Sequence, residues 1–391
     1  MLDWTLFVFA LLIFLVTLPG TIELALISIG GLWGRRRREL PSEASQCRVA
    51  AIIPVHNEEA SLARTIRSLL ACDAAPPAAD IVVMASNTTD RSVAIAREFG
   101  CTVLERVEPS RRGKGYGLNY AFRELAGAGY DAFVIIDADT VVDRNVFTEF
   151  RRVFASGADA GQVVVRVGNP EANLRTHLIN IAFLAFTHLR PLARHNLGLS
   201  AGIFNGFGVS AKTVEEVPYE CFSITEDLEY HLELIRAGKT VRFLPDCSIH
   251  SDMCVTARDA TPQRARWEGG RFRLLAEKAP QLALEMVRER DIRRLEPLLD
   301  LLLLPLAYQS VILVLLAVVA SGPLRVYAVS GLGLIVFHIV QAMILGGAKA
   351  GDWKALCAVP FYIGWKILNL GRILGAANKS AAWRRTQRSQ V

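Results

Sequence analysis

The stretch Tyr130–Asp143, YDAFVIIDADTVVD, contains the features that decide the fold. Its apolar run Ala132–Ile136 is rich in Val, Ile and Phe and is bounded by polar residues, which is typical of a buried strand of a parallel sheet. The strand ends at Asp137-Ala138-Asp139, and residues two apart on an extended chain point the same way. Both carboxylates are therefore predicted to face one point at the carboxyl edge of the sheet, where ligands bind in open α/β proteins.

Two carboxylates at such an edge suit a hard divalent cation that keeps some waters and takes phosphate oxygens as its other ligands. A D-x-D sequence also ends strands and opens turns in proteins that bind no metal, because the motif is short. The rest of the chain has to separate these two interpretations.

Strand and helix patterns alternate on both sides of this stretch. Asn57 is expected to cap a helix that opens at His56 and runs to about Leu70. The alternation predicts an α/β domain with a mostly parallel sheet. The predicted strands are Val49–Val55, Ile81–Met84, Thr102–Leu104, Ala132–Ile136, Gly161–Val167 and Val241–Leu244, and helices are expected through Phe99, at Leu118–Leu125 and from Thr225 to Ala237.

The composition indicates a soluble domain joined to membrane segments. The chain has 391 residues, of which 52% are hydrophobic and 21% charged, and its mean hydropathy is +0.30. Much of the net charge of +6 lies near apolar segments, which favours an anionic membrane surface and no nucleic-acid partner. The seven cysteines form no C-x-x-C pair, which argues against a disulfide framework or a zinc site and favours a reducing compartment.

The N-terminal apolar stretch Thr5–Trp33, interrupted by Glu23, predicts one membrane helix, kinked near Pro19-Gly20. A helix of about 20 residues crosses the hydrocarbon core of a bilayer. Four arginines follow at positions 35–38, so the positive-inside rule places the N-terminus outside and the next domain in the cytoplasm.

Two further apolar stretches, Leu298–Ala320 and Val326–Leu345, predict a membrane hairpin. Ala355–Ala377 is broken by polar residues and precedes an arginine cluster, so we expect it to lie along the cytoplasmic surface as an amphipathic helix. The predicted domains are an N-terminal membrane helix with its basic flank (1–38), a cytoplasmic domain (46–290), the hairpin (297–346) and the interfacial helix with its basic tail (355–391).

Five short motifs stand in order along the chain. They are PVHNEE at Pro54–Glu59, RGKGYGLN at Arg112–Asn119, DAD at Asp137–Asp139, TEDLE at Thr225–Glu229 and QRARW at Gln263–Trp267. In this order, with a membrane hairpin after them, the chain resembles a membrane-bound family-2 glycosyltransferase related to the cellulose, chitin and hyaluronan synthases. The resemblance covers the chain from about Val49 to Leu275.

The resemblance implies a GT-A fold, an inverting hexosyltransferase and a nucleotide-diphosphate sugar as donor, expected to be a UDP-sugar. It implies that Asp137 and Asp139 bind Mg²⁺ or Mn²⁺, and that Asp227, beside Glu226, is the general base. The donor-binding residues that it implies are Pro54, Asn57, Glu58, Ser86, Asp90, Lys114, Asp137, Gln263 and Arg266, and the acceptor residues are Trp267, Asn205 and Gly206.

The chain departs from the family at Ser86, where relatives commonly carry an aspartate that helps to hold the nucleoside. Serine can hydrogen-bond but carries no charge, so the departure affects recognition of the base or the ribose and leaves the chemistry intact. A carboxylate can deprotonate an acceptor hydroxyl, and a metal can neutralise the diphosphate leaving group. Nearby phosphate charge should raise the pKa of Asp227, and the metal should oppose this effect.

Three functional alternatives remain at this point. The first is a processive synthase at the inner membrane that extends a polysaccharide, and the second is a single transfer of a sugar to a lipid, as in ceramide glucosylation. The third is a binding or assembly subunit with an inactive transferase domain, and the intact Asp137, Asp139, Asp227 and Trp267 argue against it. Apolar segments exclude a fully soluble enzyme.

Overall fold

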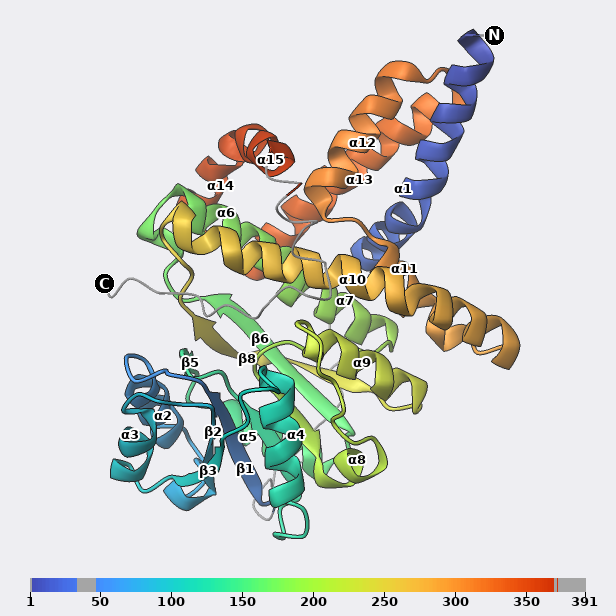
Figure 1. The fold of residues 1–391 in the computed structure, drawn as a ribbon. Helices are drawn as coiled ribbons and strands as arrows, with labels where there is room; N and C mark the ends of the chain where they lie inside the picture. Colours follow the sequence, from blue (N-terminus) through green and yellow to red (C-terminus); the bar gives the residue numbers. More distant parts are fainter. Residues whose placement is uncertain (1, 34–46, 369–370, 372–391) are drawn as a thin grey trace. The chain divides into compact units, whose positions relative to one another are not determined.

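The computed structural model describes residues 2–33, 47–368 and 371, and the chain divides into two compact units (Figure 1). The helical unit comprises Met1–Gly34 and Thr261–Ala382, and the sheet unit comprises Arg35–Ala260 and Trp383–Val391.

The sheet unit contains one eight-stranded sheet in the order β3-β2-β1-β4-β7-β6-β8-β5. The neighbours β3-β2-β1-β4 and the pair β6-β8 are parallel, whereas β7 is antiparallel to β4 and β6, and β5 is antiparallel to β8. The strands are β1 (Val49–Val55), β2 (Ile81–Ser86), β3 (Thr102–Arg106), β4 (Ala132–Ile135), β5 (Thr140–Val142), β6 (Ala160–Val167), β7 (Phe207–Ser210) and β8 (Val241–Ser251).

The α/β class is therefore confirmed, and the sheet is mixed: the expected parallel pairing holds for β3-β2-β1-β4 and for β6-β8, whereas β7 and β5 are antiparallel to their neighbours. Strand β7 is short and contains a glycine, and β5 has three residues. Such short strands carry too little side-chain periodicity to be recognised, and periodicity does not report strand direction.

Helices cover both faces of this sheet, and successive residues of β1 enter two different cores. Val49, Ala51 and Ile53 pack in one core with α2, α3 and α5, whereas Ala50 and Ile52 pack in the other with α4 and α9. The helices of the sheet unit are α2 (Leu62–Leu70), α3 (Ser92–Glu98), α4 (Lys114–Glu124), α5 (Val146–Ala155), α6 (Leu174–Phe183), α7 (Arg190–Leu197), α8 (Ala211–Glu216) and α9 (Glu226–Arg236), with a π-helical segment at Leu184–Leu189.

Helix α4 begins at Lys114, four residues before the predicted start at Leu118. Its first turn lies against the backbone of the loop that precedes α9, because a Cβ atom on Gly115 would stand 1.9 Å from the carbonyl oxygen of Cys221. Only glycine permits this approach, and the close contact fixes Lys114 beside the N-terminus of α9.

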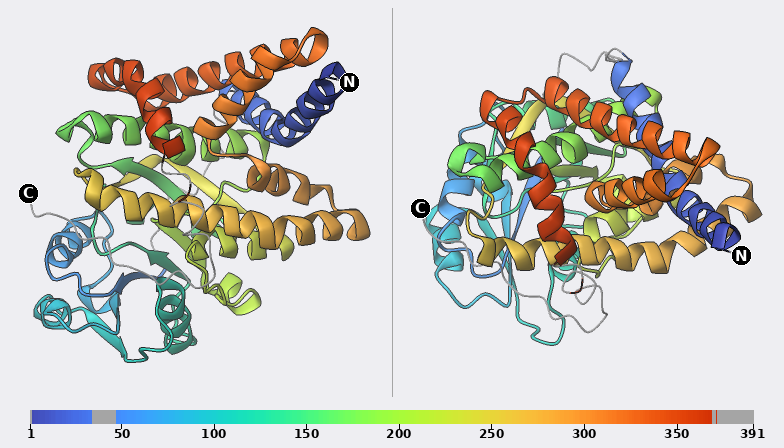
Figure 2. Two further views of the ribbon diagram at one scale, coloured as in Figure 1. Left: turned by 45° about the horizontal axis from the view of Figure 1, so that its top comes forward. Right: turned by 90° about the horizontal axis from the view of Figure 1, so that it is seen from above.

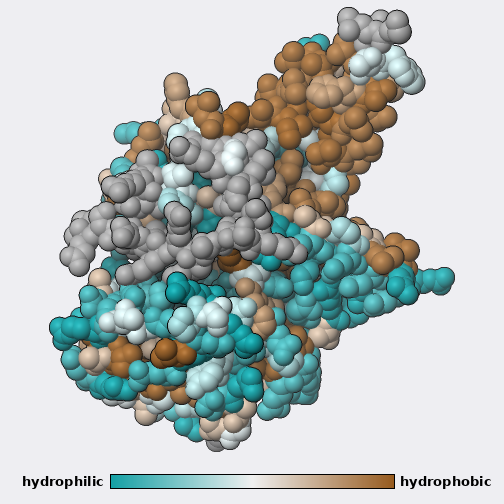
Figure 3. Space-filling model, viewed as in Figure 1, coloured by the Kyte–Doolittle hydropathy of each residue, from teal (hydrophilic) through white to brown (hydrophobic). Residues whose placement is uncertain are grey.

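In the helical unit, α1 (Leu2–Leu32), α12 (Leu306–Val319) and α13 (Gly322–Gly346) pack together, and both views in Figure 2 show α12 and α13 side by side. Polar side chains join them, since Thr17 Oγ1 lies 3.0 Å from the Tyr327 hydroxyl and Gln309 Nε2 donates to the carbonyl oxygen of Thr17 at 3.0 Å. The outward surface of these helices is strongly hydrophobic (Figure 3).

Among the described residues, two helices, Trp4–Leu32 and Gly322–Gly346, are long and apolar enough to cross a membrane. The stretch predicted as one helix, Leu298–Ala320, is broken, because α11 (Leu295–Leu302) and α12 are separated at Pro305. The helical segments on either side of the break are bent by 80° relative to each other. Counted together as one span, they are a third candidate for crossing a membrane. Proline has no N–H to continue a helix, which explains the break.

The long helix α10 (Ala257–Glu289) carries the QRARW motif, and α14 (Ala350–Ala355) and α15 (Val359–Leu368) follow α13. Lys366 of α15 makes an ion pair with Glu268 of α10 at 2.8 Å, and both side chains are nearly buried. The predicted interfacial helix 355–377 is thus helical as far as Leu368, and most of its remainder lies outside the described residues. Its location at a membrane surface stays a prediction.

We predict that Gly115→Ala destabilises the protein, because the added methyl group overlaps the Cys221 carbonyl oxygen. Overpacking of this kind costs about 1–3 kcal/mol of the free energy of unfolding. Gly117→Ala in the same helix is the matched control, since its Cβ would make ordinary contacts at 3.5 Å with Met84 and 3.7 Å with Ser86. Thermal unfolding of the detergent-solubilised protein measures both, and equal melting temperatures for the two variants would contradict the contact.

Candidate active site

The carboxyl edge of the sheet brings together side chains from three of the five motifs. Lys114, the first residue of α4, places its Nζ atom 2.7 Å from Asp137 Oδ1 and 3.9 Å from Glu226 Oε1. Asp137 follows β4, and Glu226 and Asp227 open α9. One partly buried cation thus joins the RGKG, DAD and TED motifs.

The electrostatics of this cluster follow from burial and from mutual charge. Burial alone would lower the pKa of Lys114, but the carboxylates of Asp137 and Glu226 outweigh it and raise that pKa well above its ordinary value. Burial and the neighbouring Asp227 raise the pKa of Glu226 to about 8, against the opposing charge of Lys114. Burial also raises the pKa of Asp227, and Lys114 and the backbone N–H of Leu228 counteract this rise. We therefore expect the pair Glu226 and Asp227 to retain a proton near neutral pH.

Helix α9 begins at Glu226, as the sequence indicated, with Thr225 at the N-cap position. The Thr225 side chain makes no cap hydrogen bond. Asp227 instead accepts a hydrogen bond from the backbone N–H of Leu228 at 2.8 Å, which orients its carboxylate.

The DAD turn is held by Asn205, which the sequence assigned to the acceptor. The backbone N–H of Asp137 donates to Asn205 Oδ1 at 3.0 Å, and Asn205 Nδ2 donates to Thr140 Oγ1 at 2.8 Å. Fully buried Gln162 holds the Asn205 carbonyl oxygen at 2.9 Å. Gly206 has a φ of +74° and no room for a Cβ atom, which would lie 2.5 Å from Ile249 Cδ1. These two residues shape the site, and their contact with an acceptor stays a prediction.

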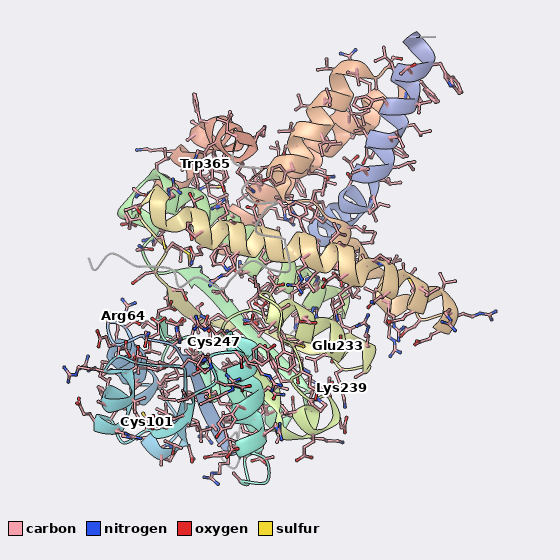
Figure 4. All side chains as sticks on the ribbon, in the orientation of Figure 1. Arg64, Cys101, Glu233, Lys239, Cys247 and Trp365 are labelled. Atoms are coloured by element: carbon pink, nitrogen blue, oxygen red, sulfur yellow. The ribbon has the colours of Figure 1, made fainter. Side chains whose placement is uncertain are left out.

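Asp139 stands beside a second acidic residue that sequence reasoning missed. Thr140 pairs with Ser251 in the antiparallel β5–β8 ladder, so Asp139 and Asp252 occupy neighbouring positions just beyond it. Arg64 of α2 (labelled in Figure 4) donates to Asp252 Oδ2 at 2.9 Å and to the Asp139 carbonyl oxygen at 3.4 Å. No motif marks Arg64 or Asp252, because only strand pairing brings them to this edge.

Two residues at this edge have the kind of side chain that binds a hard divalent cation. Asp137 and Asp139 supply carboxylate oxygens at the sheet edge, and such ions take remaining ligands from water and phosphate. Within the described part of the chain no group of three or more His, Cys, Asp or Glu side chains is placed to hold a metal. The donor set therefore suits a metal that arrives with, or is completed by, a phosphate ligand.

The loops after β1 and β2 are joined by hydrogen bonds. Asn57 has a φ of +59°, and its Oδ1 accepts hydrogen bonds from the backbone N–H groups of Thr89 at 2.7 Å and Asp90 at 3.2 Å. The prediction that Asn57 caps a helix is therefore wrong, since α2 begins at Leu62. An asparagine can adopt the left-handed conformation of a turn as readily as it can cap a helix, and the sequence does not separate the two.

Four other predicted donor residues, Pro54, Glu58, Ser86 and Asp90, belong to β1, β2 and the loops that follow them. The backbone N–H of Glu58 donates to Ser92 Oγ at 2.9 Å, and Asp90 accepts from the backbone N–H of Glu59 at 3.0 Å. Pro54 pairs with Met84 in the β1–β2 ladder, and Ser86 is the last residue of β2. Gln263, Arg266 and Trp267 belong to α10 in the helical unit, and Trp267 is 38% exposed.

The family model "Glycosyltransferase like family 2" matches residues 46–270, and the chain belongs to this family. It is thus a glycosyltransferase, and it has the GT-A-like α/β fold with a mixed sheet. Its fold is similar to that of the mannosyltransferase PcManGT from Pyrobaculum calidifontis, solved in complex with GDP-Man and Mn²⁺, with a TM-score of 0.55 and 17% identity over 89% of this chain and 100% of that one.

Two curated relatives are similar in sequence. The probable glycosyltransferase YdaM of Bacillus subtilis (strain 168) is 25% identical over 248 residues, which are 61% of this chain and 57% of that protein. The 4,4'-diaponeurosporenoate glycosyltransferase of Staphylococcus aureus (strain MRSA252) is 27% identical over 117 residues, 29% of this chain and 30% of that protein. The matched regions thus span little more than half of the first relative and less than a third of the second.

The raised pKa of Glu226 predicts how stability depends on pH. The folded protein holds the Glu226 proton up to about pH 8, whereas the ordinary pKa is 4.5, so stability is highest at low pH and falls as pH rises through this window. Glu226→Gln mimics the protonated form and should lose less stability between pH 5 and about 8 than the wild type does.

Glu229→Gln on the same helix is the control, and its pH profile should follow that of the wild type. Thermal unfolding across the pH range measures the three proteins. Parallel profiles for wild type and Glu226→Gln would show that Glu226 is not held as the acid.

Proposed function

We propose that this chain moves a hexosyl group, with inversion, from a nucleotide-diphosphate sugar to an acceptor hydroxyl at the carboxyl edge of the sheet unit. The observation that carries the proposal is the single ion-pair cluster in which Lys114 joins Asp137 of DAD to Glu226 of TED. The reaction uses a carboxylate that binds the metal, a cation beside it and a carboxylate that accepts a proton. The cluster brings such groups within a few ångströms of one another. The GDP-Man and Mn²⁺ bound by the similar mannosyltransferase support a sugar nucleotide and a divalent metal here.

Asp137 and Asp139 would hold Mg²⁺ or Mn²⁺, which would neutralise charge on the departing diphosphate. Lys114 supplies a positive charge beside Asp137 and neither gains nor loses a proton in the reaction. As the acceptor oxygen bonds to the anomeric carbon, the bond from that carbon to the phosphate oxygen breaks with its electron pair. The acceptor proton passes to a carboxylate at the start of α9.

We assign the base to Asp227. Burial raises the pKa of both carboxyl groups, that of Glu226 to about 8, so the pair shares one proton near neutral pH and one carboxylate stays ionised. The N-terminal dipole of α9 favours that ionised state. Burial makes the carboxylate a stronger base than one in water, which suits it to accept the proton of a sugar hydroxyl.

For the acceptor, the apolar helical unit supports a growing polysaccharide at the inner membrane, with Trp267 offering a face to a sugar ring. A second candidate is a single transfer to a lipid acceptor. It is favoured by the modest number of candidate spans and by the relative named for diaponeurosporenoate. Sizing the product formed by membranes from a labelled nucleotide sugar separates the two, because only the first yields a polymer.

Donor binding and proton removal are assigned to different residues, so substitutions at these residues should have different effects. Asp139→Asn keeps the side-chain shape but removes metal-binding charge, so donor affinity in Mn²⁺ should fall at least about tenfold. Asp227→Asn should keep donor affinity within a few-fold but slow transfer by about 10²–10⁴-fold, the usual contribution of a general base.

Calorimetric titration with donor and Mn²⁺, paired with a transfer assay, measures both phenotypes. Asp246→Asn, a carboxylate on the partly exposed part of β8, is the control and should behave as wild type. If Asp227→Asn lost donor affinity as severely as Asp139→Asn, Asp227 would not be the base. Transfer by the wild type in EDTA would show that the reaction does not depend on a divalent metal.

We also propose a multi-pass protein of the inner (plasma) membrane, in contact with its lipids, with the sheet unit in the cytoplasm. The arginines at 35–38 and the hydrophobic surfaces of α1 and α13 support this orientation. A reporter fused after Ser321, between α12 and α13, should lie outside, and one fused after Gly347 should lie inside. A fusion after Gly347 that reports an external location would reverse the proposed topology.

A further inference from the structure

Helix α15 contacts the helix that carries the QRARW motif at two points, and both helices belong to the helical unit. The Arg264 guanidinium of α10 lies 4.9 Å from the ring centroid of Tyr362, and Glu268 Oε1 lies 2.8 Å from Lys366 Nζ. Within each helix the two residues are i and i+4 neighbours, which share one face. The face of α10 that carries Arg264 and Glu268 is called the clasped face below.

The ion pair is enclosed, and a third helix contributes to it. The Lys366 side chain is 6% exposed and that of Glu268 is 14% exposed. From α12, the Tyr308 hydroxyl donates to Glu268 Oε2 at 3.4 Å, and the Tyr308 ring centroid lies 4.9 Å from Lys366 Nζ. The two carboxylate oxygens of Glu268 therefore have different partners, which hold the carboxylate in one orientation.

An enclosed ion pair of this kind fixes an arrangement more than it adds stability. Taking two charges out of water costs roughly what their attraction contributes, so apolar side chains of similar size would hold the helices together at least as well. Removal of one partner, in contrast, leaves a buried charge without compensation. The pair of Lys366 and Glu268 thus selects one position of α15 along α10.

The motif residue Trp267 stands at the edge of the clasped face. It precedes Glu268, so it lies about 100° round the axis of α10 from that residue, and it is 38% exposed. Sliding α10 by one residue would turn the indole by about 100° and move it by about 1.5 Å along the axis. A misplacement of about 1 Å can lower the rate of an enzyme about 100-fold.

We propose that Lys366 is a positioning residue that acts through Glu268 on Trp267, so that α15 sets how the acceptor is presented. The inference rests on the proposed function, which assigns Trp267 to the acceptor. It gives α15 a part in sugar transfer in addition to its predicted place at the membrane surface. Sequence patterns do not reveal this part, because only packing brings Lys366 to the motif.

The test is a double-mutant cycle in which membranes transfer sugar from a panel of labelled UDP- and GDP-sugars. Lys366→Met and Glu268→Gln should each lower transfer about ten- to hundredfold. Trp267→Ala should lower transfer as well, and Lys366→Met should cost little more once Trp267 has been replaced, because its effect passes through that residue. Lys366→Arg keeps a cation against Glu268 and should retain more transfer than Lys366→Met does.

A second measurement needs no turnover. In protein labelled with 5-fluorotryptophan, the fluorine resonance of Trp267 is assigned by its loss in Trp267→Phe. This resonance should move or broaden in Lys366→Met and in Glu268→Gln. Lys354→Met, at an exposed lysine of α14 in the same unit, is the control and should leave both transfer and the resonance unchanged.

Full transfer by Lys366→Met, or losses that simply add in the double variant, would overturn the positioning role. An unchanged Trp267 resonance in both single variants would overturn it too. If Lys366→Met does not fold, Glu268→Gln carries the same cycle with Trp267→Ala. Absence of transfer by wild type from every sugar nucleotide would overturn the proposed function, and the fluorine resonance would still decide whether Lys366 positions Trp267.

Discussion

The ion pairs of Lys114 are the interaction on which the rest of the site depends. Asp137, Glu226 and Asp227 bring three carboxyl groups to one edge of the sheet, and Glu226 is buried at the start of α9. Buried carboxylates are costly unless a cation or a proton compensates them. Lys114 supplies the cation and Glu226 retains a proton, so the cluster persists without a metal and can still gain one.

Lys114 can make these contacts only because the backbone around it is closely packed. Gly115 lets the first turn of α4 approach the carbonyl oxygen of Cys221, a few residues before α9. On the other side, Gln162 and Asn205 hold the backbone of the DAD turn. The charged groups thus keep their places through neutral contacts, and a site of fixed dipoles and charges needs little reorganisation when a substrate binds.

The sequence predicted the α/β class, the strand before Asp137, the start of α9 and the three motifs that meet at Lys114, because strand ends and helix starts carry local signals. It did not predict β5, β7 or their antiparallel pairing, since very short strands depend on their neighbours in space. Arg64, Asp252 and Gln162 were missed for the same reason. Two local signals were misinterpreted. Asn57 was expected to cap a helix, but asparagine also adopts the left-handed conformation of a turn. The apolar run that contains Pro305 was expected to form one helix, but the helix breaks there.

The two compact units also divide the proposed chemistry. Residues assigned to donor, metal and base lie mostly in the sheet unit, whereas Trp267, assigned to the acceptor, lies on α10 of the helical unit. Its neighbour Glu268 is fixed by Lys366 at 2.8 Å, and Lys366 lies 4.9 Å from the ring centroid of Tyr308. The orientation of α10 is therefore set by helices α12 and α15 of its own apolar unit. A change of acceptor can then arise through packing in the helical unit while Lys114 and its carboxylates stay unchanged.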